Sequence, residues 1–242
     1  MAINYSFLHE LIKKNPRIVF LGGAGVSTDS GIPDFRSKEG IYNVQSKYGV
    51  PYEVMLSHTY FMEHTETFYD FYWSTMVKKG AKPNAAHLAL ASYEKRGLPI
   101  TILTQNIDGL HQDAGSKAVY ELHGSTRRYF CQECGKRYSL DEIEPKGIPH
   151  CSCGGILKPD VVLYEEPLDE SLLEQSVNAL RFCDTLIVGG TSLNVYPAAG
   201  LINYFGGSLS ILINKEATPQ DGFFKYVIHD DIAVALKELL KP

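Results

Sequence analysis

The chain has 242 residues with 23 basic and 28 acidic side chains, a formal net charge of −5, and 44% hydrophobic residues. This ordinary globular composition excludes a disordered or collagen-like chain, and it predicts one large domain or one domain with a small insertion. A net negative chain lacks the basic field that autonomous nucleic-acid binding requires, so we expect no nucleic-acid partner.

We expect no segment of the chain to span a membrane. The longest apolar runs, such as Ile18–Leu21 and Thr185–Val188, are far shorter than the roughly 20 residues that a spanning helix needs. Residues Met1–Asn15 mix charged and apolar side chains at helical spacing, so they predict an amphipathic helix rather than a secretory signal. The sequence therefore predicts a cytoplasmic protein.

Short apolar runs alternate with helix-like stretches along most of the chain, and each run ends in glycine or a polar residue. Such runs are typical of strands buried on both faces of a parallel sheet. The predicted strands are Ile18–Leu21, Ile100–Leu103, Val161–Leu163, Thr185–Val188, Leu209–Ile213 and Val227–Ile228. The predicted helices are His87–Lys95, Leu168–Leu180, Tyr196–Phe205 and Ile232–Leu240. This alternation predicts an α/β fold with a doubly wound, Rossmann-like parallel sheet.

Two segments interrupt the alternation. Residues 41–79 are rich in aromatic side chains and predict a helical insertion, whereas residues 124–157 contain four cysteines and many turn residues. We expect both to form a smaller lobe beside a Rossmann-like domain made of residues 1–40, 80–123 and 158–242. The cleft between the two lobes is then the expected place for a small ligand.

The first predicted strand runs into the glycine-rich segment Gly22–Thr28, which permits a tight turn and a close approach of backbone amides to a pyrophosphate. The acidic residue that usually follows a dinucleotide fingerprint by about 20 positions is missing. A structural turn would explain the glycines equally well. Next, Gly31 and Pro33 interrupt any helix, so Asp29–Arg36 is expected to be a loop that could close over a ligand with Phe35 and Arg36.

Polar side chains crowd the end of the strand Ile100–Leu103, because Gln105, Asn106 and Asp108 follow it closely. The carboxyl ends of strands are where open α/β sheets bind ligands. His123 ends a short alternating segment next to the cysteine-containing module, so it is expected to face the cleft. Neutral imidazole is the natural general base near neutral pH, although a lone histidine is more often structural.

Four of the five cysteines form two close pairs, Cys131 with Cys134 and Cys151 with Cys153. Two such pairs can hold one tetrahedral zinc ion, and four thiolates leave no open position for catalysis. The sequence therefore predicts one structural zinc rather than disulfides. Cys183 stands alone at the start of a buried strand and is interpreted as a core thiol.

Taken together, these segments resemble the sirtuin family of NAD-dependent protein deacylases, in its minimal bacterial form. The matching segments follow the family order from about residue 15 to residue 235, so the resemblance covers nearly the whole chain. They are Gly23–Arg36, Thr104–His111, His123–Gly124, the two cysteine pairs, Lys158–Val162, Gly190–Pro197 and Ile213–Asn214.

The resemblance implies roles for individual residues. Its NAD-binding residues would be Ala24, Gly25, Thr28, Phe35, Arg36, Gln105, Ile107, Asp108, Thr191, Ser192, Asn214 and Ile232. Asn106 would share the nicotinamide pocket with Ile107 and Asp108, and His123 would be the general base. Val161 and Val162 would bind the acyl-lysine peptide as an added strand. The partners implied are acylated-lysine proteins or peptides, while the oligomeric state stays open.

The reaction implied by the resemblance removes an acetyl or other acyl group from lysine. The acyl oxygen attacks the nicotinamide ribose and expels nicotinamide, and His123 then removes a ribose hydroxyl proton. The products would be free lysine, nicotinamide and 2′-O-acyl-ADP-ribose. An NAD-dependent mono-ADP-ribosyltransferase on the same scaffold is the alternative, but it would not need His123. A hydride-transferring dehydrogenase fits less well, because the acidic residue is missing and the first helix is broken.

Two positions bear on the substrate. Glu165 stands where the family usually has glycine, close to the expected peptide groove. In sirtuins that prefer succinyl-lysine, a tyrosine and an arginine three positions later meet the acyl carboxylate. Here Tyr72 is followed by Thr75, which carries no charge, so we expect acetyl to be preferred over succinyl.

Overall fold

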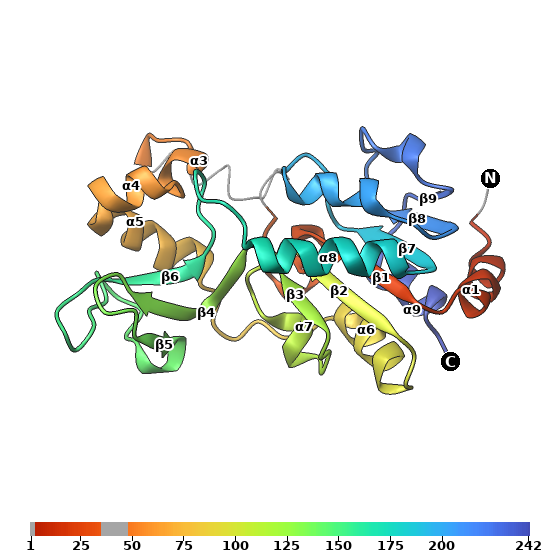
Figure 1. The fold of residues 1–242 in the computed structure, drawn as a ribbon, viewed down its shortest axis with the longest axis horizontal. Coiled ribbons are helices and arrows are strands. Elements are labelled where there is room, and N and C mark those ends of the chain that lie inside the picture. Colours follow the sequence, from red (N-terminus) through yellow and green to blue (C-terminus); the bar gives the residue numbers. More distant parts are fainter. Residues whose placement is uncertain (1–2, 35–47) are drawn as a thin grey trace.

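The computed structural model describes residues 3–34 and 48–242, and the strands in these ranges form two separate sheets (Figure 1). The larger sheet is parallel and has the order β3-β2-β1-β7-β8-β9. Its strands are β1 (Ile18–Gly22), β2 (Ile100–Thr104), β3 (Val119–Glu121), β7 (Thr185–Gly189), β8 (Leu209–Ile213) and β9 (Tyr226–Ile228). The direction of winding reverses at β1, so the switch point where such sheets bind ligands lies between β1 and β7.

Helices cover both faces of this sheet because alternate residues of its central strands point to opposite sides. Ile18 and Phe20 of β1 pack into a core with α1 (Tyr5–Lys14), α6 (Ala85–Lys95) and α9 (Ile232–Leu239). Val19 and Leu21 pack into a second core with α8 (Glu170–Phe182) and the 3₁₀ helix η6 (Ala198–Tyr204). The predicted doubly wound fold is therefore confirmed. We call this sheet with these helices the large lobe.

The smaller sheet is antiparallel and consists of β5 (Arg137–Ser139), β4 (Gly124–Cys131) and β6 (Leu157–Val161). Three short α-helices and a π-helix lie beside it, at the end of the molecule away from both termini (Figure 1). They are α3 (Tyr52–Met55), α4 (His58–Glu63), α5 (Thr65–Phe71) and η4 (Tyr72–Met76). Their buried aromatic rings share one core with Tyr129, Leu157 and Leu163 of the sheet region. This sheet and these helices form the small lobe.

Shorter elements connect the two lobes and the larger helices. Two 3₁₀ turns, η1 (Ala24–Val26) and η2 (Thr28–Ser30), follow β1, and Gly31 ends them with a φ of 78°. The remaining short elements are α7 (Leu110–Asp113), η5 (Leu140–Glu142) and η7 (Asp221–Phe223). In the described ranges, no helix is both long and apolar enough to cross a membrane.

Two predicted elements are wrong. The apolar run Val161–Leu163 is not a strand of the parallel sheet, because β6 ends at Val161 and pairs antiparallel with β4. An apolar run signals burial but does not identify its partner strand. The stretch expected as a helix over Tyr196–Phe205 is a 3₁₀ helix over Ala198–Tyr204, and Gly200 in its middle is a weak helix former.

Candidate functional site

A cleft of about 1330 Å³ lies at the carboxyl ends of β1, β2, β7 and β8 and extends to the small lobe. The structure brings together in it every described residue that the sequence singled out for NAD, substrate or catalysis. These are Ala24, Gly25, Thr28, Gln105, Asn106, Ile107, Asp108, His123, Val161, Val162, Thr191, Ser192, Asn214 and Ile232. Phe35 and Arg36 lie outside the described residues.

The glycines after β1 allow the loop that follows β1 to pack closely against the loop that follows β7. The Gly25 amide donates to the Gly190 carbonyl at 2.8 Å, and a Cβ on Gly25 would lie 2.8 Å from the Gly190 Cα. Gly190 itself has a φ of 61°. No L-side chain fits between these backbones, so the loop after β1 packs directly on the loop that carries Thr191.

A partly buried polar network lines the cleft beside the loop after β1. The Asn106 Nδ2 donates to the Ser27 Oγ at 3.0 Å, and the Ser27 hydroxyl donates to the Asp108 Oδ2 at 2.7 Å. The Leu110 amide donates to the other oxygen of Asp108 at 2.8 Å. These bonds fix the side chains of Asn106 and Asp108 in one arrangement. Sequence reasoning missed Ser27, although it directly follows the glycine-rich turn.

Two buried histidines lie behind this network and were also missed. The His87 Nε2 lies 3.5 Å from the Ser27 Oγ, and the rings of His87 and His111 are 4.7 Å apart. Burial lowers the pKa of His87, and burial followed by the neighbouring His87 lowers the pKa of His111 to about 3. Both rings are therefore neutral at physiological pH, and only the fold brings His87 to Ser27 and His111 to His87.

His123 is held so that one ring nitrogen remains available. It follows β3 at the start of the small lobe, and its Nδ1 lies 3.0 Å from the Gln105 carbonyl oxygen. A carbonyl only accepts, so Nδ1 carries the proton and Nε2 presents a lone pair. Burial lowers the pKa of His123, and the hydrogen bond to Gln105 opposes this shift to a smaller extent. The lowered pKa keeps the ring neutral at physiological pH.

The remaining predicted contacts line the outer part of the cleft. The Gln105 Nε2 donates to the Thr191 Oγ1 at 3.2 Å, which links the loop after β2 to the loop after β7. Asn214 follows β8, and its Nδ2 donates to the Glu216 carbonyl at 2.8 Å. Ile232 begins α9 and closes the apolar wall beside Gly189. A dinucleotide would thus meet polar loops at the switch point and an apolar wall at one end.

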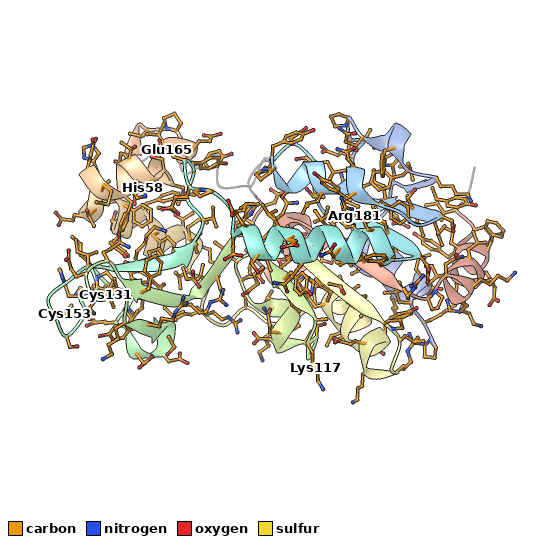
Figure 2. All side chains as sticks on the ribbon, in the orientation of Figure 1. His58, Lys117, Cys131, Cys153, Glu165 and Arg181 are labelled. Carbon is orange, nitrogen blue, oxygen red and sulfur yellow. The ribbon has the colours of Figure 1, made fainter. Side chains whose placement is uncertain are left out.

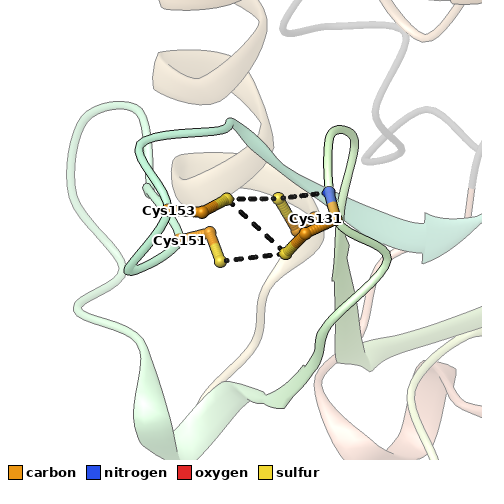
Figure 3. Close-up of side chains that lie close together, drawn as sticks. Cys131, Cys151 and Cys153 are labelled. Atoms are coloured by element: carbon orange, nitrogen blue, oxygen red, sulfur yellow. Dashed lines mark hydrogen bonds between the residues drawn. The ribbon is translucent and has the colours of Figure 1, made fainter.

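The four paired cysteines meet in the small lobe (Figure 3), and Figure 2 shows Cys131 and Cys153 at the end of this lobe away from the large lobe. Their sulfur atoms all lie within 4.8 Å of one another, with separations of 3.5 Å for Cys131–Cys153 and 3.6 Å for Cys134–Cys151. A tetrahedron of sulfurs about 2.3 Å from zinc has edges of about 3.8 Å, so the donor set fits this ion. Cys183 lies apart from them in the large lobe, as predicted.

Comparison with known proteins agrees with this geometry. The model of the Sir2 family matches residues 23–197. An NAD-dependent protein deacetylase of Clostridium acetobutylicum is 56% identical over 236 residues, which cover 96% of each chain. One of Clostridium tetani is 55% identical over 232 residues, covering 95% of this chain and 94% of that relative.

Solved structures give the same result. A complex of Sir2 with a p53 peptide and NAD⁺ superposes with a TM-score of 0.84 at 32% identity, covering 99% of this chain and 98% of the other. A complex of a Sir2 homologue with ADP-ribose gives a TM-score of 0.88 at 34% identity, covering 99% and 96%. The motifs, the two-lobed fold and these matches together show that the chain belongs to the Sir2 family, the sirtuins.

Proposed function

We propose that this protein is an NAD-dependent protein deacetylase that removes acetyl groups from lysine side chains. Several relatives that are 51% to 56% identical to it bear that name. The observation that carries the proposal is the neutral His123, whose Nε2 is free to accept a proton in the same cleft as the Asn106 network.

NAD supplies an electrophilic ribose carbon when it is bound, and it leaves the reaction as nicotinamide and 2′-O-acyl-ADP-ribose. Ala24, Gly25, Thr28, Thr191 and Ser192 would hold its phosphates and ribose near the switch point. Asn214 and Ile232 would bind the adenosine end, and Gln105 the nicotinamide ribose. The fixed side chains of Asn106 and Asp108, with Ile107, would orient the carboxamide. Phe35 and Arg36 are assigned to the cofactor loop by the family motif alone.

His123 would act as general base on a ribose hydroxyl, because its Nδ1 donates to the Gln105 carbonyl and leaves Nε2 to take the proton. The alternative, a mono-ADP-ribosyltransferase, needs no such base. The names of the relatives and the orientation of His123 both favour deacetylation.

The acyl-lysine peptide would bind along Val161 and Val162 as an added strand. A buried ion pair supports this segment. The Lys158 Nζ donates to the Val161 carbonyl and to the Glu166 Oε2, both at 3.0 Å, and the Leu163 amide donates to the same carboxylate oxygen at 2.9 Å. The peptide would therefore meet a backbone that is already fixed.

One zinc would be held by Cys131, Cys134, Cys151 and Cys153, and it would have a structural role because four thiolates leave no position for substrate. We further propose the division into a Rossmann-like NAD-binding domain of residues 1–40, 80–123 and 158–242, a helical insertion of residues 41–79 and a zinc-binding module of residues 124–157. The separate cores of the large and small lobes support a division into two lobes. Residues 158–163 pack with the small lobe, through the pairing of β6 with β4 and through Leu163.

A cytoplasmic location is part of the same proposal. Zinc needs the four cysteines as thiolates, which a reducing compartment preserves. Fractionation of cells from the source organism, with detection of the protein in each fraction, tests this location.

The function is tested by mass spectrometry of the products after incubation with NAD and an acetyl-lysine peptide. We expect free lysine peptide, nicotinamide and acetyl-ADP-ribose in equal amounts. ADP-ribosylated peptide would support the alternative, and an unchanged acetyl peptide would contradict the proposal.

A further inference from the structure

Glu165 occupies an unusual position on the rim of the cleft. It lies in the loop between β6 and α8 (Figure 2), three residues after Val162. It lines the cleft together with Val161, Val162 and Leu163. Its φ is 76°, in the left-handed region that most side chains avoid. The side chain is exposed to solvent.

The carboxylate of Glu165 is held in place by α4. Its Oε2 accepts hydrogen bonds from the Thr59 amide at 2.9 Å and from the Thr59 hydroxyl at 2.7 Å. These bonds lower the pKa of Glu165, so the group is ionised at physiological pH. In the described part of the chain, no residue bonds to Oε1, and no lysine or arginine forms an ion pair with this carboxylate.

The neighbouring carboxylate of Glu166, in contrast, has partners of its own. Lys158 is buried and pairs with the Glu166 Oε2, and the His58 Nδ1 lies 2.9 Å from the Glu166 Oε1. Figure 2 shows Glu165 and His58 on neighbouring segments at the top of the small lobe. Glu166 is thus paired with Lys158, whereas no lysine or arginine pairs with Glu165 in the described residues.

The segment that contains the expected peptide groove includes no basic residue. Residues 161–168 contain neither lysine nor arginine, and their charged residues are Glu165 and Glu166. A peptide lying along Val161 and Val162 would therefore lie close to one fixed carboxylate that has no lysine or arginine partner among the described residues.

We propose that Glu165 is a specificity-determining residue that selects acyl-lysine peptides with an arginine or lysine at the flanking position that passes over it. This inference rests on the proposed peptide groove along Val161 and Val162. A carboxylate that is already immobilised by Thr59 loses little side-chain entropy when it meets a guanidinium, and its Oε1 remains free to accept.

A purely structural role for Glu165 would be to hold the start of α4 through Thr59. That role needs only a hydrogen-bond acceptor, which glutamine also provides, whereas selection of basic peptides needs the charge. Glu165→Gln therefore separates the two roles. Glu170→Gln is the matched control, because Glu170 is also exposed and follows in the same acidic stretch but does not line the cleft.

The experiment measures two quantities for acetyl-lysine peptides in which a single arginine or glutamate is placed at each flanking position in turn. The first is the Kd of each peptide for the whole protein without NAD, and the second is kcat/KM with NAD. In the unmodified protein, we expect arginine to be preferred over glutamate at one position by about threefold to fivefold at low salt. The preference should shrink as ionic strength rises.

Glu165→Gln should abolish that preference, and Glu170→Gln should retain it. An equal arginine-to-glutamate ratio at every position in the unmodified protein, or an unchanged ratio in Glu165→Gln, would overturn the inference. Charge-dependent peptide binding without any deacetylation would instead contradict the proposed function and leave the role of Glu165 standing.

Discussion

The two lobes bury different kinds of side chain. The cores of the large lobe are mainly aliphatic, and the strands that carry them are parallel and buried on both faces. The small lobe is built from aromatic rings, among them Tyr69, Tyr72 and Tyr129, around a three-stranded antiparallel sheet. Its cysteine cluster lies at the end of that sheet away from the large lobe (Figure 2).

This difference indicates how each lobe is stabilised. A six-stranded sheet covered by helices on both faces supplies enough buried apolar area for its own stability. The small lobe has short helices and short strands, and small units of this kind usually need a metal or disulfides. We infer that the large lobe can persist without zinc, whereas the small lobe depends on it.

Removal of zinc is the strongest test of this difference in stability between the two lobes. In Cys151→Ala/Cys153→Ala we expect zinc to be lost and the small lobe to unfold, because the free energy of metal binding, about 10 kcal/mol or more in small zinc modules, is also folding free energy. The single tryptophan, Trp73, is stacked on Tyr69 in the small lobe and reports on this lobe alone.

The measurement combines metal analysis, Trp73 fluorescence and far-ultraviolet circular dichroism. We expect zinc to fall to zero and the Trp73 emission to shift to the red, while most helical signal remains. Cys183→Ala is the control, since Cys183 lies in the large lobe and should leave both zinc and Trp73 unaffected. A full equivalent of zinc in the double variant would contradict the assignment.

His123→Ala tests whether the chemistry depends on the imidazole at the border of the two lobes. A general base typically contributes about 10²–10⁴-fold in rate, so kcat/KM for the acetyl peptide should fall by that factor. NAD affinity, zinc content and Trp73 emission should stay close to those of the unmodified protein. Turnover near the normal rate would remove His123 from the proposed mechanism.

The parts of the structure that the sequence predicted well depend on local patterns. Five of the six apolar runs form parallel strands, and in β1, β7 and β8 continuous burial on both faces leaves a clear apolar signature. The cysteine pairs and the polar segment after β2 were predicted from residue type and spacing alone. Each of these signals lies within a few neighbouring residues.

The structural features that we did not predict from the sequence depend on contacts between segments that are distant in the chain. Val161–Leu163 has the same apolar pattern as a parallel strand, and only its pairing with β4 distinguishes it. Ser27 meets Asp108 across 81 residues, and His87 reaches Ser27 across 60. Likewise, nothing local to Glu165 indicates that its carboxylate binds Thr59. Such partners are fixed by the tertiary fold.

The preference for one acyl group over another tests the part of the cleft that the small lobe lines. Tyr72 and Thr75 of η4 are both buried and line the cleft, as the expected acyl pocket requires. Thr75 cannot pair with a carboxylate, and burial of an unpaired carboxylate is strongly unfavourable. We expect kcat/KM for acetyl-lysine to exceed that for succinyl-lysine in the same peptide by at least about tenfold. Equal turnover would direct attention to Lys78, a cation of the same cleft.

The smallest expected effect concerns the pH dependence of the reaction. Burial lowers the pKa of His123, and only the neutral ring could act as the proposed base, so activity should fall only below the folded pKa. An ordinary histidine of pKa 6.5 would be about one-quarter neutral at pH 6, which would give about a fourfold lower kcat/KM than at pH 8. For this protein we expect a smaller drop than that.

The measurement is kcat/KM for an acetyl peptide between pH 5.5 and 8.5, checked against Trp73 emission at each pH to ensure that the small lobe stays folded. A fourfold or larger loss at pH 6 with unchanged emission would contradict this expectation, because it would show that the His123 imidazole, at the border of the two lobes, is not shielded from solvent during the reaction.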